Sequence, residues 1–252
     1  MLQVVAGGAD ALDRVERWIY NPPSGERLDP ERTTLLSPIP RPPKLICIGL
    51  NYRDHAAESN SAIPDVPTVF SKFHTAVIGH RHPIVLPKDT SKPDYEAEFA
   101  VVIGRGGRRI PEASWREHVF GYTIVNDVSA RDVQAATSQW MLSKTFDTFA
   151  PIGPAIVTAD EIEDPHTLDL SLALNGEVMQ SSNTRNLIFG VPKLIAHLSS
   201  VFTLEPGDVI ATGTPAGVGF ARKPPRWLKP GDECRVRIEK IGELVNPVVA
   251  EA

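Results

Sequence analysis

The 252-residue chain contains only two cysteines, Cys47 and Cys234, and no Cys-x-x-Cys spacing. This scarcity excludes a disulfide framework or a cysteine-based zinc site and fits a reducing compartment. The N-terminal residues 1–18 include acidic side chains but no basic segment and no apolar run near the length of a signal sequence or a membrane span. We therefore predict a cytoplasmic protein with no membrane partner.

The chain also has only a small excess of charge of one sign. The 26 Lys and Arg residues nearly balance the 31 Asp and Glu residues, which leaves a net charge of −5. No general attraction to nucleic acid or to an anionic membrane is expected from this balance. The composition, 42% hydrophobic and 23% charged, excludes a disordered chain, and a chain of this length buries about 70% of its surface. A small substrate, which could be anionic, is left as the natural partner.

The sequence lacks a nucleotide-binding loop. Its two glycine-rich stretches are residues 101–110, VVIGRGGRRI, and residues 209–220, VIATGTPAGVGF. Neither has the spacing of a dinucleotide-binding loop or the lysine of a P-loop. The first is typical of a turn. The second could be a plain wide turn, or its free N–H groups and Thr214 could hold a small carboxylate.

Two regions of different character follow one another along the chain. Residues 9–20, ADALDRVERWIY, carry apolar side chains at helical spacing, and the proline-containing run 21–32 predicts the end of that helix. We therefore divide the chain into a small helical and extended segment, residues 1–43, and a larger domain, residues 44–252.

The larger domain is dominated by short β-branched or aromatic runs bounded by Gly, Pro, Asp or Asn, which predict strands. The Asn175-Gly176 pair predicts a tight hairpin, and a second hairpin is expected at Gly242. Residues 192–202 begin with proline and predict a helix. The apolar face of this helix comprises Leu194, Ile195, Leu198 and Val201. The fold class expected is α+β and mainly β, without the regular alternation of a doubly wound sheet.

A pair of glutamates lies in one predicted strand, DYEAEFAVVIG. Because alternate residues of a strand point to the same side, Glu96 and Glu98 share one face, whereas Phe99 and Val101 lie on the other. One interpretation is a strand whose polar face is in solvent. The other is a pair of like charges that needs a cation, since two unpaired buried carboxylates cannot both stay ionised.

A third carboxylate, Asp127, follows the apolar run VFGYTIVN and precedes a helix-like segment. Such a residue can be a site residue or a helix N-cap. Three carboxylates without cysteine or clustered histidine would form a hard oxygen site, suited to Mg²⁺, Mn²⁺ or Ca²⁺.

The segment CIGLNYRDHAAES places His55 and Glu58 three residues apart on a short predicted helix. At this spacing a carboxylate can orient an imidazole. The pair could be an ordinary surface pair. If His55 instead faces a bound carbonyl group, it is a natural general base near neutral pH.

Taken in order, GLNYRDHAAES, DYEAEFAVVIG, GYTIVNDVSARDVQ, KTFDTFAPIGP and GDVIATGTPAGVG resemble the fumarylacetoacetate hydrolase family over residues 44–249. The resemblance is to the branch of 2-hydroxyhepta-2,4-diene-1,7-dioate isomerases and acylpyruvate hydrolases. It implies a mixed β roll of packed sheets with short helices, usually as a homodimer. The segment before Lys44 is shorter than in many members of the family.

The resemblance also implies roles for individual residues. Glu96, Glu98 and Asp127 would bind Mg²⁺ or Mn²⁺, with Ca²⁺ in some members. His55 and Glu58 would form a catalytic pair on a segment, about residues 53–63, that orders as a lid over the substrate.

Four further positions match residues of the family pattern. Lys144 matches a catalytic lysine. Arg131, Gln134 and Thr214 match positions that contact the substrate. From the sequence alone Arg131 and Lys144 could equally be surface charges, and Gln134 an exposed helix residue.

The function implied is a divalent-metal-dependent hydrolase that cleaves the carbon–carbon bond of a 2,4-diketo acid of the acylpyruvate type through an enolate. The alternatives are an isomerase of the 2-hydroxyhepta-2,4-diene-1,7-dioate type and an oxaloacetate decarboxylase. A non-catalytic carboxylate-binding protein is the alternative from another class, and it would not need the His55 and Glu58 pair. In each case the partner is a small 2-oxo acid.

Overall fold

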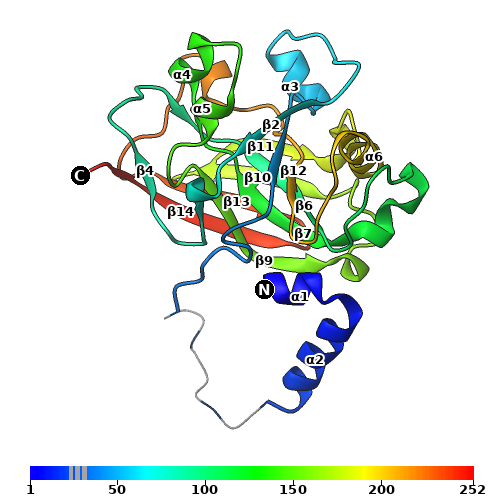
Figure 1. Ribbon diagram of the computed structural model, residues 1–252. Helices are drawn as coiled ribbons and strands as arrows, with labels where there is room; N and C mark the ends of the chain where they lie inside the picture. The colour runs from blue at the N-terminus through cyan, green and yellow to red at the C-terminus, as the bar shows by residue number, and fades with distance from the viewer. Residues whose placement is uncertain (23–24, 26–28, 30–32) are drawn as a thin grey trace.

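The computed structural model describes residues 1–22, 25, 29 and 33–252, and two packed β-sheets form its centre (Figure 1). The larger sheet has seven strands in the order β2 (Thr68–Lys72), β1 (Leu45–Gly49), β12 (Val209–Ala211), β6 (Ala97–Ile103), β7 (Val119–Asn126), β9 (Ala150–Thr158) and β3 (Val77–Ile78). The second has five strands in the order β11 (Glu177–Asn183), β10 (Asp169–Leu174), β13 (Glu233–Ile238), β14 (Gly242–Ala250) and β4 (Ile84–Leu86). A short two-stranded sheet pairs β5 (Pro93–Asp94) with β8 (Ser129–Ala130).

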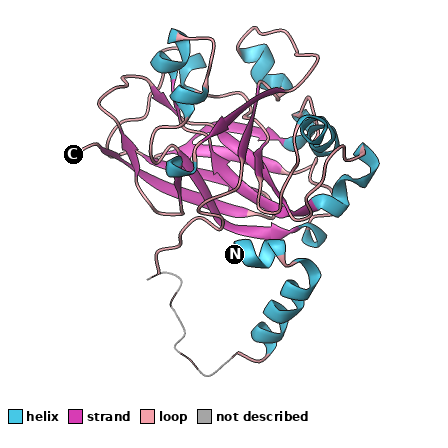
Figure 2. Cartoon of the chain, in the orientation of Figure 1, coloured by secondary structure: helices cyan, strands magenta, loops and turns pink. Residues whose placement is uncertain are grey.

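The helices are short and lie around these sheets (Figure 2). The α-helices are α1 (Leu2–Ala6), α2 (Gly8–Tyr20), α3 (Arg53–Glu58), α4 (Arg131–Ala136), α5 (Met141–Lys144) and α6 (Val191–Val201). The 3₁₀ helices are η1 (His74–Ala76), η2 (Glu112–His118), η3 (Ala159–Glu161), η4 (Thr184–Asn186) and η5 (Gly219–Ala221). The predicted class, α+β and mainly β, is confirmed. In the described residues no helix is long and apolar enough to cross a membrane.

The core has two parts, one on each face of the seven-stranded sheet. Between the two sheets, Phe99 and Tyr122 pack on strand residues such as Leu172 and Val236 and on α6. On the other face, a smaller cluster brings Val5 of α1 against the sheet. Because β6 is covered on both faces, all seven of its residues are buried. A polar side chain on this strand therefore lies in the interior.

Both hairpins predicted from the sequence are present in the structure. Asn175 and Gly176 both have positive φ, 55° and 85°, and join β10 to β11 in the expected hairpin. The hairpin at Gly242 is also confirmed, between β13 and β14.

The predicted apolar face of α6 is only partly buried. Leu198 is buried, but Val201, which is predicted on the same face, is 65% exposed. Val201 is the last residue of the helix.

The helix predicted at residues 9–20 is α2, which begins one residue earlier at Gly8 and is preceded by α1. Most of the run 21–32 lies outside the described residues. The apolar side chains of α2 meet little of the core, because Trp18, Ile19 and Tyr20 are each at least 70% exposed. Figure 1 shows α2 extending away from the sheets.

Candidate functional site

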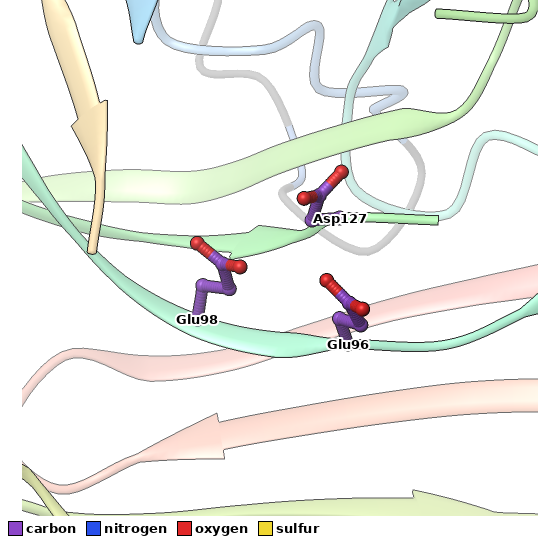
Figure 3. A group of neighbouring side chains, drawn as sticks. All are labelled: Glu96, Glu98 and Asp127. Carbon is purple, nitrogen blue, oxygen red and sulfur yellow. The ribbon is translucent and has the colours of Figure 1, made fainter. Parts of the chain in front are cut away.

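Three carboxylates meet where β6 and β7 run side by side (Figure 3). The two strands are antiparallel, with Ala97 opposite Asn126. This register places Glu96, just before β6, beside Asp127, just after β7, and the Asp127 N–H donates to the Glu96 carbonyl at 2.9 Å. One ligand oxygen from each of Glu96, Glu98 and Asp127 lies within 4.8 Å of the others.

All three carboxylates are buried, at 5% exposure or less. The alternative of a solvent-facing strand for Glu96 and Glu98 is therefore wrong, because the seven-stranded sheet is covered on this face. The alternative of an N-cap for Asp127 is also wrong, since the N-cap of α4 is Ala130. Each acid is instead turned into the interior beside the other two.

Two buried lysines neutralise part of this charge. Lys144 Nζ lies 2.6 Å from Glu96 Oε2 and 2.8 Å from Asp127 Oδ2. Lys72 Nζ lies 2.5 Å from the other oxygen of Asp127 and also donates to the carbonyls of Val128 and Phe149. Both oxygens of Asp127 are therefore held in fixed positions.

The carboxylates differ in their electrostatic surroundings. Burial alone would raise the pKa of Glu96, but Lys144 and Arg131 lower it to about 2. Burial, together with Asp127 and Glu96, raises the pKa of Glu98 well above its usual value. Among the described residues Glu98 makes no ion pair with a basic side chain, and its Oε2 accepts from the Gly213 N–H at 2.9 Å. The three carboxylates supply oxygen ligands, and one of them, Glu98, has no described basic side chain to neutralise it. A hard divalent cation fits such a set of ligands.

His55 lies at the same cavity, on α3. Its Nδ1 is 3.5 Å from Glu58 Oε2, so the predicted proximity of the pair is confirmed. The carboxylate of Glu58 in turn accepts from the Gly217 N–H at 2.9 and 3.1 Å. His55 is buried, at 9% exposure, whereas Glu58 is an exposed residue, so the imidazole lies in the interior and its partner nearer the surface.

The start of α3 is firmly attached to the rest of the protein. Asn51 donates to the carbonyls of Phe189 and Thr212. Asp54 accepts a hydrogen bond from Ser182 at 2.5 Å. These contacts fix the end of the helix that carries His55.

Arg131 connects the carboxylates to a second wall of the cavity. Its guanidinium contacts Asp94 at 2.9 Å and Glu96 at 2.5 Å, and donates to Gln134 Oε1 at 2.9 Å. It also lies over the ring of Phe220, 4.7 Å from the ring centroid. Arg131 and Lys144 are thus interior groups, and their alternative as surface charges is wrong.

The glycine-rich loop after β12 carries Thr214 into the cavity. Its glycine N–H groups do not form the free carboxylate cradle that the sequence left open, since Gly213 donates to Glu98 and Gly217 to Glu58. The loop therefore holds the site's own acids. Thr214 is buried and lines the cavity.

These groups surround one cavity of about 210 Å³. Its lining comprises Ile48, Gly49, Leu50, His55, Ser59, Ser61, Phe70, Glu96, Glu98, Arg131, Gln134, Trp140, Lys144, Thr214 and Phe220. Seven of the nine site residues predicted from the sequence thus line it. Asp127 and Glu58 do not, although each touches a residue that does. The volume is below the roughly 300–1,000 Å³ of pockets for drug-sized ligands, which indicates a small substrate.

The sequence analysis missed three buried polar residues of this region: Lys72, Asp94 and Gln180. Asp94 accepts from the N–H groups of Gly219 and Phe220 as well as from Arg131. The available signal was a charged or amide side chain inside a short predicted strand, as in TVFSK for Lys72.

Comparison with known proteins agrees with this arrangement. A sequence model described as "Fumarylacetoacetate (FAA) hydrolase C-terminal" matches residues 44–249. A curated Bos taurus protein named oxaloacetate tautomerase FAHD2A, mitochondrial, is 50% identical over 86% of this chain and 69% of its own length.

Two solved structures are similar to this chain. The 2-hydroxyhepta-2,4-diene-1,7-dioate isomerase of Mycobacterium marinum is 40% identical with a TM-score of 0.79, covering 91% of this chain and 82% of its own. The maleylpyruvate hydrolase of Sphingobium sp. SYK-6, solved with manganese(II) and pyruvate, is 32% identical with a TM-score of 0.84, covering 100% and 86%.

Proposed function

Because the chain belongs to the fumarylacetoacetate hydrolase family, we propose that it is a divalent-metal-dependent oxaloacetate tautomerase. The observation that carries the proposal is the meeting, at one small cavity, of three buried carboxylates with the His55 and Glu58 pair. A relative named oxaloacetate tautomerase, half identical over most of the chain, supports this choice among the reactions of the family.

Glu96, Glu98 and Asp127 are the residues that would hold the ion. A bound Mg²⁺ or Mn²⁺ supplies a Lewis acid that polarises a substrate carbonyl and so makes the adjacent C–H more acidic. Lys72 and Lys144 keep the Asp127 carboxylate in place.

The cavity offers hydrogen-bond donors to an anionic substrate. Arg131 has five N–H donors, and its three bonds to Asp94, Glu96 and Gln134 leave two. Gln134 also lines the cavity, and because its Oε1 accepts from Arg131, its amide NH₂ group is left to donate. A dicarboxylate such as oxaloacetate matches donors of this kind.

His55 is the group that would move the proton. Tautomerisation takes a proton from C3 of the 2-oxo acid and places one on the 2-oxygen, which is general acid–base chemistry. His55 lines the cavity, and Glu58 Oε2 lies 3.5 Å from its Nδ1, where the carboxylate can orient the ring. The rings of Phe220 and His55 pack edge to face, with their centroids 6.2 Å apart.

Hydrolysis of an acylpyruvate is the second candidate. A base at His55 could equally deprotonate a water for attack on a 4-carbonyl group, and a solved relative with 32% identity is a maleylpyruvate hydrolase. The isomerase and decarboxylase alternatives start from the same enolate chemistry.

A substrate panel tests the proposal. We expect the Mg²⁺- or Mn²⁺-loaded protein to accelerate the interconversion of enol and keto oxaloacetate, followed by ultraviolet absorbance, without stoichiometric release of pyruvate. Chelation should return the rate to that of buffer. If enol oxaloacetate decays at the buffer rate while acylpyruvates are cleaved to pyruvate, the enzyme is a hydrolase and the tautomerase proposal is wrong.

The lid predicted over residues 53–63 is divided by the structure into two parts. Residues 53–56 are held by the contacts of Asp54, whereas most of the residues from 57 to 66 are exposed at the surface, although Glu58 is hydrogen-bonded to Gly217. We therefore predict that amides 57–63 exchange quickly in the ligand-free protein and become protected when pyruvate is bound. Hydrogen exchange with and without pyruvate measures this, with β6 as the internal reference. Equal protection of residues 57–63 in both states would argue against a moving lid.

A further inference from the structure

Gln180 lies on β11, behind the wall of the cavity. Its side chain is buried, with 1% exposure, and is not among the residues that line the cavity. The amide sits between the start of β6 and the loop that carries Thr214. A neutral amide in the interior satisfies its hydrogen bonds within the protein, and those of Gln180 can be followed one by one.

Backbone groups fix which way this amide faces. The Ala97 N–H donates to Oε1 at 2.9 Å, and Nε2 donates to the Pro215 carbonyl at 2.9 Å. A backbone N–H can only donate and a carbonyl can only accept, so the amide cannot be turned over. The second N–H of Nε2 then donates to Thr214 Oγ1 at 2.8 Å.

This contact determines whether the Thr214 hydroxyl donates or accepts a hydrogen bond at the cavity. A hydroxyl group can donate one hydrogen bond and accept two. Thr214 accepts from Gln180, and within the described part of the chain no group accepts its proton. Because Thr214 lines the cavity, its O–H remains free to donate to a ligand oxygen there.

We propose that Gln180 is a positioning residue that presets Thr214 as a hydrogen-bond donor to a carboxylate or carbonyl oxygen of the 2-oxo acid. The inference rests on the proposed function for the class of ligand. The amide of Gln134 is oriented in a similar way, because its Oε1 accepts from Arg131. Groups fixed before binding do not lose orientational freedom when the anion arrives.

The test replaces the Gln180 amide group, which donates to Thr214, with a carboxylate, which can only accept. In Gln180→Glu an ionised carboxylate accepts the Thr214 proton, so the hydroxyl presents only lone pairs to the substrate. Loss of a hydrogen bond to a charged group corresponds to a rise in the KM for oxaloacetate of roughly ten- to a hundred-fold. The Kd for pyruvate, measured by calorimetry on the metal-loaded protein, should rise by a similar factor while kcat changes much less.

A double-mutant cycle separates positioning from structural damage. Thr214→Val keeps the shape of the side chain but removes the hydroxyl, so Gln180→Glu should add less than about two-fold to KM in that background. An equal rise in KM with and without the Thr214 hydroxyl would overturn the inference. If Gln180→Glu does not fold, Gln180→Leu only frees the hydroxyl, and its smaller rise in KM must also vanish in Thr214→Val.

The outcomes for the wild-type protein distinguish the two proposals. Wild-type protein that converts oxaloacetate, with unchanged KM and Kd in Gln180→Glu, would overturn the role of Gln180 alone. Wild-type protein that neither converts oxaloacetate nor binds pyruvate would overturn the proposed function, and the inference with it.

Discussion

Replacement of Glu98 by glutamine is expected to lower turnover by a factor on the order of 10³, because a metal ion contributes several kcal/mol of charge stabilisation to such reactions. Glu98 is the member of the carboxylate set without an ion pair to a described basic side chain, so the bound cation would depend on it most. The affinity for Mg²⁺ or Mn²⁺, measured by calorimetry, should fall together with the rate.

The matched control is Glu117→Gln. Unlike Glu98, which pairs with no described basic side chain, Glu117 is ion-paired in the structure, but it and its partner Arg105 are each more than 60% exposed, and a surface pair of this kind contributes little. Rate and metal affinity should therefore remain those of the wild-type protein. Full activity in a rigorously metal-free wild-type sample would show that the carboxylates have another role.

Removal of the His55 imidazole is expected to have an effect of comparable size. His55→Ala should lower the tautomerase rate by a factor on the order of 10² to 10⁴, the usual contribution of a positioned acid–base group. Metal affinity should stay nearly unchanged, because His55 is not among the three carboxylates that would hold the ion. Rate and metal content are measured on the same purified sample.

The exposed residue His74, on η1, gives a control of the same type. His74→Ala should behave as wild type in both measurements. Any oxaloacetate decarboxylation should fall much less than tautomerisation in His55→Ala, since loss of CO₂ does not require a base. A wild-type tautomerase rate in His55→Ala, or loss of the metal along with the rate, would assign the proton transfer to another group.

The elements predicted best from the sequence are those whose signal is local. The Asn175-Gly176 hairpin follows from the positive φ that both residues adopt. The shared face of Glu96 and Glu98 follows from the two-residue period of a strand. The segment 44–249 that resembled the family is also the segment that the family model matches.

What the sequence could not show depends on contacts between distant elements. Lys72 lies on an edge strand, and only the fold brings it to Asp127, 55 residues later. The apolar residues of α2 recur with a helical period, but Trp18 and Ile19 are exposed. A helical period shows which residues share a face and does not show which surface that face packs against. The homodimer and the cytoplasmic location stay predictions.

The charges buried around the cavity carry a consequence for the order in which ligands bind. The acidic members are Asp94, Glu96, Glu98 and Asp127, and the basic members are Lys72, Arg131 and Lys144. With or without a proton on Glu98, this group alone has no net positive charge. A divalent cation reverses the sign, so a dianionic substrate meets an attractive field only after the metal has bound. Binding should therefore be sequential, with the metal first and the 2-oxo acid second.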